Sequence, residues 1–310
     1  MTRKLTWLLQ SLLAGVIFVL LVWAGGSILA RPASWPVAVP EPPAQRVELR
    51  TRDGVALEGS YWPQAPEDGP AVLLLHGINN DRAIFAAQAR WLNELGYAVL
   101  AIDFRGHGAS AAVERTFGWS ESADAEAALA WLRRRSPDRK VGVIGVSLGG
   151  AAALLGEEGP LAADTLVLHA VYPHLRKAIL NRLERSGSPV AAALAEPLLS
   201  YQSWLRYGVA PERISPLEGI KRFRGAVLVI GGTRDRDTRI EDSRALYEAA
   251  PGPKALWLVE GASHVETSNL WTDEYRARVR CLFARTLGEP RRHRGGARPF
   301  EQPCATSRSS

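Results

Sequence analysis

The segment 141–150 places one serine between two glycines at a fixed spacing. It reads Val-Gly-Val-Ile-Gly-Val-Ser-Leu-Gly-Gly, so Gly145 stands two residues before Ser147 and Gly149 two residues after it. The β-branched run before the serine predicts a strand, and the Gly- and Ala-rich run after it predicts a helix. A sharp turn between them brings strand and helix so close that side chains larger than hydrogen would collide. The pattern predicts a nucleophile elbow, with Ser147 at a helix N-terminus where backbone N–H groups stabilise negative charge.

A serine hydroxyl becomes a nucleophile when a base takes its proton, and that base needs a carboxylate to fix its tautomer and stabilise its cation. In chains with this elbow the acid and then the histidine follow the serine. His264 lies in a small-residue loop after the later predicted strands, whereas His293 belongs to a basic terminal segment, so His264 is the predicted base. Asp235 is the predicted acid because it lies closest to the end of the strand at 226–230. Asp237, two residues further on, is kept as an alternative.

The negative charge of an acyl-transfer intermediate needs two N–H donors aimed at one point. Leu148, directly after the nucleophile, is expected to supply the first donor. The second is expected from Ile78, in the loop His-Gly-Ile-Asn-Asn that follows the strand at 72–75. Gly77 is expected to let this loop turn.

Apolar strand-like runs alternate with helical patterns through most of the chain, which predicts a parallel sheet covered by helices on both faces. A domain over residues 46–288 is expected, with a small helical cap at about 171–215. The predicted strands are 46–50, 55–61, 72–75, 98–102, 141–146, 165–168, 226–230 and 255–259. The predicted helices are 83–95, 121–134, 149–157, 175–185, 190–206, 241–249 and 275–287.

The formal net charge of +6 resides largely at the two ends of the chain. Arg3 and Lys4 carry two of these charges and the segment 289–310 carries three, which leaves one for residues 5–288. A nearly neutral body argues against a nucleic-acid partner. The segment 289–310 is predicted to be a basic disordered tail. No Cys/His cluster has the spacing of metal ligands, so neither a metal nor another cofactor is expected.

The N-terminal run from residue 5 to residue 30 has no charged side chain and is long enough to cross a bilayer. Its length favours a transmembrane anchor (1–30) over a cleaved signal peptide, although Ala24 and Ala30 each offer a small residue for cleavage and secretion. Arg3 and Lys4 favour an inside N-terminus. The chain is therefore expected in the inner (cytoplasmic) membrane as a single-pass protein facing the periplasm or the outside. The Pro-rich segment 31–45 is interpreted as a linker that spaces the domain from the membrane.

Six short motifs follow one another along the chain. They are Leu75-His76-Gly77, Asp103 to Gly108, Gly145 to Gly149, Ile214 to Pro216, Gly232 to Asp235 and Ser263-His264. With these motifs in this order, the chain resembles the α/β-hydrolase fold serine hydrolases, close to bacterial esterases, monoacylglycerol lipase-like enzymes and serine aminopeptidase-like proteins. The resemblance spans about residues 46 to 287 and implies the fold and a Ser-His-Asp triad without a cofactor. Relatives that dehalogenate or open epoxides use an aspartate in place of Ser147, so those reactions are disfavoured.

The functional hypothesis is a membrane-anchored serine hydrolase that cleaves a carboxylic ester or thioester through an acyl-enzyme. Its expected substrate is a small acyl ester or a lipid-like molecule. A serine peptidase, an acyltransferase with the same triad and a non-catalytic binding protein of the same fold are the alternatives.

Overall fold

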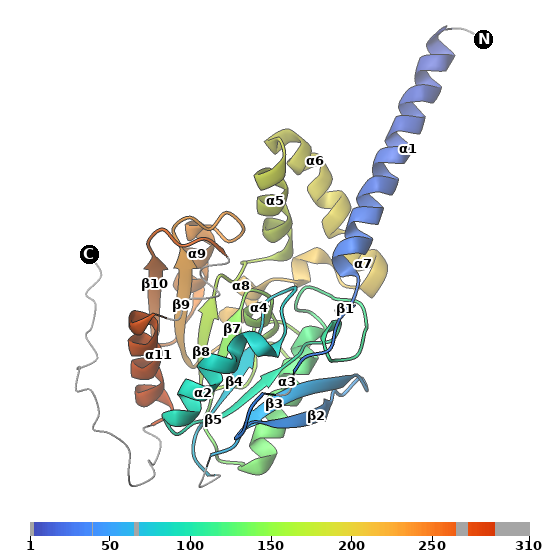
Figure 1. Ribbon diagram of the computed structural model, residues 1–310. Helices are drawn as coiled ribbons and strands as arrows, with labels where there is room; N and C mark the ends of the chain where they lie inside the picture. Colours follow the sequence, from blue (N-terminus) through green and yellow to red (C-terminus); the bar gives the residue numbers. More distant parts are fainter. Residues whose placement is uncertain (1–2, 39, 65–67, 265–271, 289–310) are drawn as a thin grey trace.

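The computed structural model describes residues 3–38, 40–64, 68–264 and 272–288, and its centre is one eight-stranded sheet (Figure 1). The strand order is β10-β9-β8-β7-β4-β5-β3-β2, in which β3 is antiparallel to β2 and β5 and the other neighbours are parallel. The predicted fold class is confirmed. The strands are β2 (Gln45–Arg50), β3 (Ala56–Trp62), β4 (Ala71–Leu75), β5 (Ala98–Ile102), β7 (Val141–Val146), β8 (Thr165–His169), β9 (Ala226–Gly232) and β10 (Lys254–Val259).

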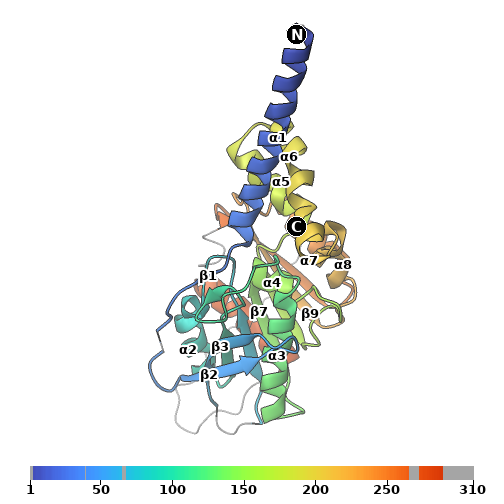
Figure 2. The same ribbon diagram turned by 90° about the vertical axis from the view of Figure 1, so that its right-hand side faces the viewer.

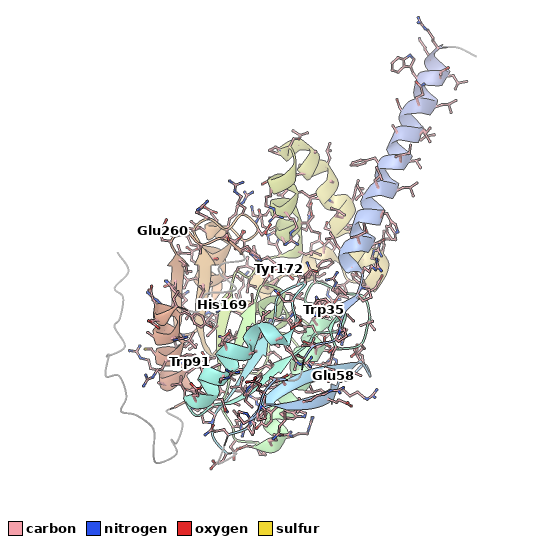
Figure 3. The ribbon with its side chains drawn as sticks, viewed as in Figure 1. Trp35, Glu58, Trp91, His169, Tyr172 and Glu260 are labelled. Atoms are coloured by element: carbon pink, nitrogen blue, oxygen red, sulfur yellow. The ribbon has the colours of Figure 1, made fainter. Side chains whose placement is uncertain are left out.

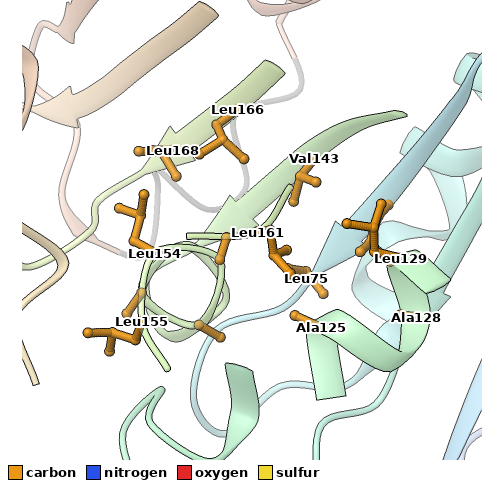
Figure 4. Packing of buried hydrophobic residues seen from close by; sticks show 14 of the residues in the cluster. Leu75, Ala125, Ala128, Leu129, Val143, Leu154, Leu155, Leu161, Leu166 and Leu168 are labelled. Carbon is orange, nitrogen blue, oxygen red and sulfur yellow. The ribbon is translucent and has the colours of Figure 1, made fainter. Parts of the chain in front are cut away.

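Side chains that alternate along each strand give the sheet two apolar faces. Leu73 and Leu75 point to the face covered by α3 and α4, where Figure 4 shows Leu75 beside Ala125. Val72 and Leu74 point to the opposite face, against α2 and α11. Because both faces are covered, the central strands are continuous apolar runs. The covering helices are α2 (Ala86–Glu94), preceded by the 3₁₀ turn η1 (Arg82–Phe85), α3 (Glu121–Arg135), α4 (Leu148–Ala152), α8 (Pro216–Ile220), α9 (Ile240–Ala249) and α11 (Asp273–Thr286).

The helix after the elbow, α4, is shorter than its predicted range of 149–157. It ends at Ala152 because the chain turns back beyond it. The Ala153 carbonyl accepts a hydrogen bond from the Leu161 N–H at 2.9 Å, in place of a helical donor four residues on. Gly156 then adopts a φ of 106°, which the chain needs for this reversal.

The insertion between β8 and β9 forms a helical cap beside the carboxyl edge of the sheet (Figure 2). It contains α5 (Leu175–Ser186), α6 (Pro189–Ser200), α7 (Gln202–Tyr207) and the 3₁₀ turn η2 (Pro211–Arg213). The predicted helix at 190–206 is divided at Tyr201, which follows the last residue of α6 and precedes the first residue of α7. Because the helix is interrupted there, α7 changes direction and contacts the C-terminal part of the N-terminal helix.

The N-terminal helix α1 (Arg3–Ala30) extends away from the domain and packs against α6 near its C-terminal end (Figures 1 and 2). Most of its large apolar side chains are exposed. At 28 residues its length is about 42 Å, more than the roughly 30 Å of a hydrocarbon core. The helix is therefore a candidate membrane anchor or signal sequence.

The Pro-rich segment that follows α1 lies along the domain instead of holding it at a distance. Its two-residue strand β1 (Ala33–Ser34) pairs in parallel with β6 (His107–Gly108). Trp35 adds a hydrogen bond from its indole Nε1 to the Asp81 carboxylate at 2.7 Å (Figure 3). Backbone pairing and the half-buried indole satisfy polar groups that a free spacer would leave in water, so the segment is docked.

In the loop after β5, Arg105 pairs with two carboxylates that differ in solvent exposure. Its guanidinium Nε donates to Asp124 at 2.8 Å, and its Nη1 donates to Asp53 at 2.6 Å. The Asp124 side chain is fully buried, whereas 48% of the Asp53 side chain is exposed. Removing each carboxylate in turn therefore compares the stability contributed by a buried and by an exposed partner of Arg105.

Replacing Asp124 with Ala is expected to lower the free energy of unfolding by about 3–5 kcal/mol, because it removes the buried partner of a buried charge. Asp53→Ala removes the exposed partner and should cost about 1 kcal/mol or less. Urea unfolding of the full-length protein in detergent, followed by tryptophan fluorescence, measures both changes. Equal losses for the two variants would contradict this account of the Arg105 pair.

Candidate active site

The turn between β7 and α4 has the geometry of a nucleophile elbow. Ser147 adopts φ 47° and ψ −106°, a strained conformation for a residue with a side chain. Its N–H donates to the His169 carbonyl at 2.8 Å, and its carbonyl accepts from the Ala151 N–H at 3.0 Å. These two hydrogen bonds, one through its N–H and one through its carbonyl, hold Ser147 in the strained conformation. The sharp turn from strand to helix that the sequence predicts is therefore present.

The glycines around Ser147 differ in how much room they have. A Cβ on Gly145 would lie 2.6 Å from the Gly150 backbone, and one on Gly149 would overlap the carbonyl of Leu75. Both positions therefore require glycine. A Cβ on Gly77 would meet no atom closer than 3.6 Å, and Gly77 is not among the residues of positive φ. The loop after β4 therefore does not depend on glycine at position 77 for its turn, contrary to expectation.

Asp235 and His264 lie in direct contact beyond the ends of β9 and β10. The imidazole Nδ1 is 2.8 Å from Asp235 Oδ2. Asp235 Oδ1 accepts the backbone N–H groups of Asp237 and Thr238, each at 2.8 Å. Because the carboxylate has no proton to give, Nδ1 is the donor and Nε2 carries the lone pair of the neutral ring. A histidine held in this way can accept a proton from a hydroxyl.

Asp237 lies at the same edge but faces different partners. Its Oδ2 accepts from Arg185 Nη1 at 2.8 Å, and Arg182 lies 3.8 Å from its Oδ1. The backbone N–H of Asp237, and not its carboxylate, takes part in the contact with Asp235. The geometry therefore favours Asp235 over Asp237 as the partner of His264.

Ser147, His264 and both predicted oxyanion donors line a single pocket between the sheet and the cap. Leu148 is the first residue of α4, and Ile78 lies on the loop whose Gly77 approaches the Ser147 Cβ. Tyr172, labelled in Figure 3, also lines the pocket. The apolar cap side chains in the lining are Leu175, Ala178, Ile179, Leu183 and Leu199. The other cap residues in the lining are Arg182, Ser200, Gln202, Ser203, Arg206 and Tyr207.

His76 holds the loop that carries Ile78 in place through the hydrogen bonds of its ring. Burial lowers the pKa of His76 to about 4, so its ring is neutral near pH 7. Its Nε2 accepts the Phe104 N–H at 3.1 Å, which makes Nδ1 the donor to the Gly77 carbonyl at 2.8 Å. His76 therefore ties the loop after β4 to the loop after β5.

Two contributors to this region were not predicted from the sequence. Arg82 forms a buried ion pair with Asp103 and fixes the start of η1. Gly26 and Leu29, from the end of α1, line the pocket with Ser147. A long uncharged run predicts a membrane span and carries no signal that its end approaches a site far along the chain.

Within the residues that the structure describes, no group of three or more His, Cys, Asp or Glu side chains is arranged to hold a metal ion. The site thus consists of a serine on a strained turn, a histidine oriented by a buried carboxylate and an apolar pocket.

Comparison with known proteins places this chain in a family. A family model described as "Serine aminopeptidase, S33" matches residues 67–207. An uncharacterized protein of Mycobacterium tuberculosis is 32% identical over 227 residues, which cover 72% of this chain and 73% of the relative. The uncharacterized protein YqkD of Bacillus subtilis is 26% identical, over 69% of this chain and 72% of that protein.

A solved esterase of Pyrococcus furiosus, Pf2001, superposes with a TM-score of 0.66 at 25% identity, over 83% of this chain and 99% of the esterase. The chain therefore belongs to the α/β-hydrolase family. Within that family it is an esterase-like hydrolase.

The crowding at Gly149 predicts that Gly149→Ala destabilises the protein by about 3 kcal/mol or more, at or above the usual range for an overpacked core, because the new methyl group meets backbone. Gly77→Ala is the matched control and should change the free energy of unfolding by less than about 1 kcal/mol. Urea unfolding measures both variants. A Gly149→Ala protein as stable as Gly77→Ala would show that the elbow is less tightly packed than described.

Proposed function

We propose that the protein is a membrane-anchored serine hydrolase that cleaves a carboxylic ester or thioester through a Ser147–His264–Asp235 triad. The 2.8 Å contact between His264 Nδ1 and a carboxylate that two backbone N–H groups already fix carries the proposal. This arrangement orients His264 Nε2 as a base, and Ser147 lines the same pocket.

In the first half of the reaction, Ser147 Oγ attacks the carbonyl carbon as His264 Nε2 takes the hydroxyl proton. Asp235 stabilises the resulting imidazolium without accepting its proton. The N–H groups of Leu148 and Ile78 are the proposed donors to the oxyanion, and the positive end of α4 adds to this field. The intermediate collapses when the leaving oxygen or sulfur departs with the proton that His264 held.

In the second half, a water molecule replaces the leaving group. His264 takes a proton from the water while its oxygen attacks the acyl carbon, and the same two N–H groups receive the second oxyanion. His264 then returns the proton to Ser147 Oγ, which releases the acid. No step needs a metal or an organic cofactor.

Charge in the pocket supports ester over peptide cleavage. A peptidase that captures a substrate amino group needs an unpaired acidic side chain near the nucleophile. Among the pocket-lining residues that the structure describes, Asp237 is the one acid, and Arg185 pairs with it. The match to a serine aminopeptidase model keeps peptide cleavage as the second candidate. An acyltransferase would use the same acyl-enzyme and pass it to another acceptor.

The contacts at the end of α1 support an anchor that is retained. Ala30 is buried, and its carbonyl accepts from the Arg115 N–H at 2.9 Å. Arg206 of the cap donates to Ser27 at 2.6 Å and lies 4.3 Å from the centre of the Trp23 ring. Cleavage at Ala30 would remove all these contacts. With Arg3 and Lys4 inside, the domain faces the periplasm or the exterior.

Ser147→Ala is expected to lower kcat for an ester substrate by at least about 10⁴-fold, because it removes the attacking oxygen. The substitution keeps the Cβ, so the unfolding midpoint should stay close to that of the wild type. Hydrolysis of p-nitrophenyl acetate by the detergent-purified full chain measures the loss. A fluorophosphonate probe should label the wild type at Ser147 and leave the variant unlabelled; turnover by the folded variant would refute the nucleophile.

Asp235→Asn is expected to lower kcat by about 10⁴-fold, because an amide at this position favours the wrong tautomer of His264. Asp237→Asn, its matched control two residues away, should lower kcat by less than about tenfold. Steady-state kinetics on the same ester compares the two. A larger loss for Asp237→Asn would assign the triad acid to Asp237.

A further inference from the structure

The end of α1 takes part in the pocket as well as linking the domain to its anchor. Gly26 and Leu29 line the same cavity as Ser147 and His264, although more than a hundred residues separate the two pairs in sequence. Leu29 is an apolar residue and the last but one of the helix. The cap adds Leu175, Ile179, Leu183 and Leu199 to the same lining, beside polar residues such as Arg182 and Arg206. The leucine and isoleucine side chains offer a hydrocarbon chain apolar contacts.

Specific polar contacts fix α1 against α7 at this place. The Gln202 amide Nε2 donates to the carbonyl of Val22 at 3.1 Å, and its Oε1 accepts from Arg206. A Cβ on Gly26 would overlap this amide. The absence of a side chain at Gly26 thus lets α7 approach the helix closely enough for both to share the pocket wall.

A second chain of contacts connects α1 to the loop that carries Ile78. The N–H of Arg115 donates to the last carbonyl of α1, at Ala30. Arg115 Nη1 also donates to Asn79 Oδ1 at 2.7 Å, next to the proposed oxyanion donor. The position of α1 is therefore fixed relative to the reacting atoms on two sides.

The outer surface of the cap beside α1 is also apolar. On α6, Val190, Leu194 and Leu198 recur every four residues and are exposed, from 39% at Leu198 to 71% at Val190. Trp204 and Leu205 of α7 extend this exposed surface. A soluble face would carry polar residues here, whereas a face continuous with a membrane helix is in keeping with lipid.

We propose that the last two turns of α1 form a wall of the acyl-chain site, and that Leu29 sets the chain length the enzyme accepts. The substrate class is an ester whose long acyl chain resides in the membrane and enters the pocket between α1 and the cap. This inference rests on the proposed function, because it assigns the acyl portion of the substrate of Ser147.

The test fills this wall with a larger side chain. Leu29→Trp in the full-length protein in nanodiscs should lower the ratio of kcat/KM for p-nitrophenyl palmitate to that for the acetate by at least about tenfold, since a blocked pocket rejects the longer chain. Leu29→Phe should give an intermediate ratio. Ile28→Trp is the matched control, because Ile28 is 70% exposed and is not among the pocket-lining residues.

The outcomes separate the inference from the proposed function. A ratio that falls in Leu29→Trp and stays at the wild-type value in Ile28→Trp supports α1 as a pocket wall. An unchanged ratio in Leu29→Trp, or an equal fall in Ile28→Trp, overturns it while Ser147-dependent hydrolysis of acetate still stands. A folded wild-type protein that cleaves no ester overturns the proposed function and this inference together.

Discussion

The close contact between the start of α4 and the end of β4 is the constraint on which the site depends. Gly149 lies so near the Leu75 carbonyl that no side chain fits between them. This approach brings a helix N-terminus and the loop after β4 to one point, beside Ser147. The proposed oxyanion donors, Leu148 and Ile78, lie on these two segments. The strain at Ser147 is held by hydrogen bonds to β8 and α4, so the rest of the sheet maintains the turn.

A second layer of buried polar residues keeps the loops around this contact in place. Neutral His76 joins the loops after β4 and β5, and the Arg82–Asp103 pair joins the latter to η1. Arg105 links the same loop to Asp124 on α3. These groups are too deeply buried to meet a substrate. Their hydrogen-bond partners are backbone groups, one another, Ser60 and Asp53. Their hydrogen bonds limit the freedom of the loops that they join.

Local chemistry made the fold and much of the candidate site predictable. Apolar runs bounded by Gly and Pro predicted the strands of the central sheet to within two residues. The turn at Ser147, Asp235 and His264 were predicted from chain order and small-residue loops.

The features that the sequence did not predict depend on contacts between residues far apart in the chain. The early end of α4 depends on a hydrogen bond from Leu161, and the docking of residues 33–35 depends on a partner strand at His107. The role of Leu29 in the pocket depends on where the cap lies, which no periodicity encodes. The tail at 289–310, which the sequence predicts to be disordered, lies outside the described residues.

The two-residue pairing of β1 with β6 has a mechanical consequence. A flexible tether would let the domain rotate about its anchor and sample every orientation above a bilayer. Here the chain leaves α1 at Ala30 and is bound to the domain by Ala33, so only a few residues can act as a hinge. If α1 spans a membrane, the tilt of that helix sets the angle at which the pocket meets the leaflet. A change in bilayer thickness that changes this tilt would therefore also change the orientation of the pocket relative to the membrane.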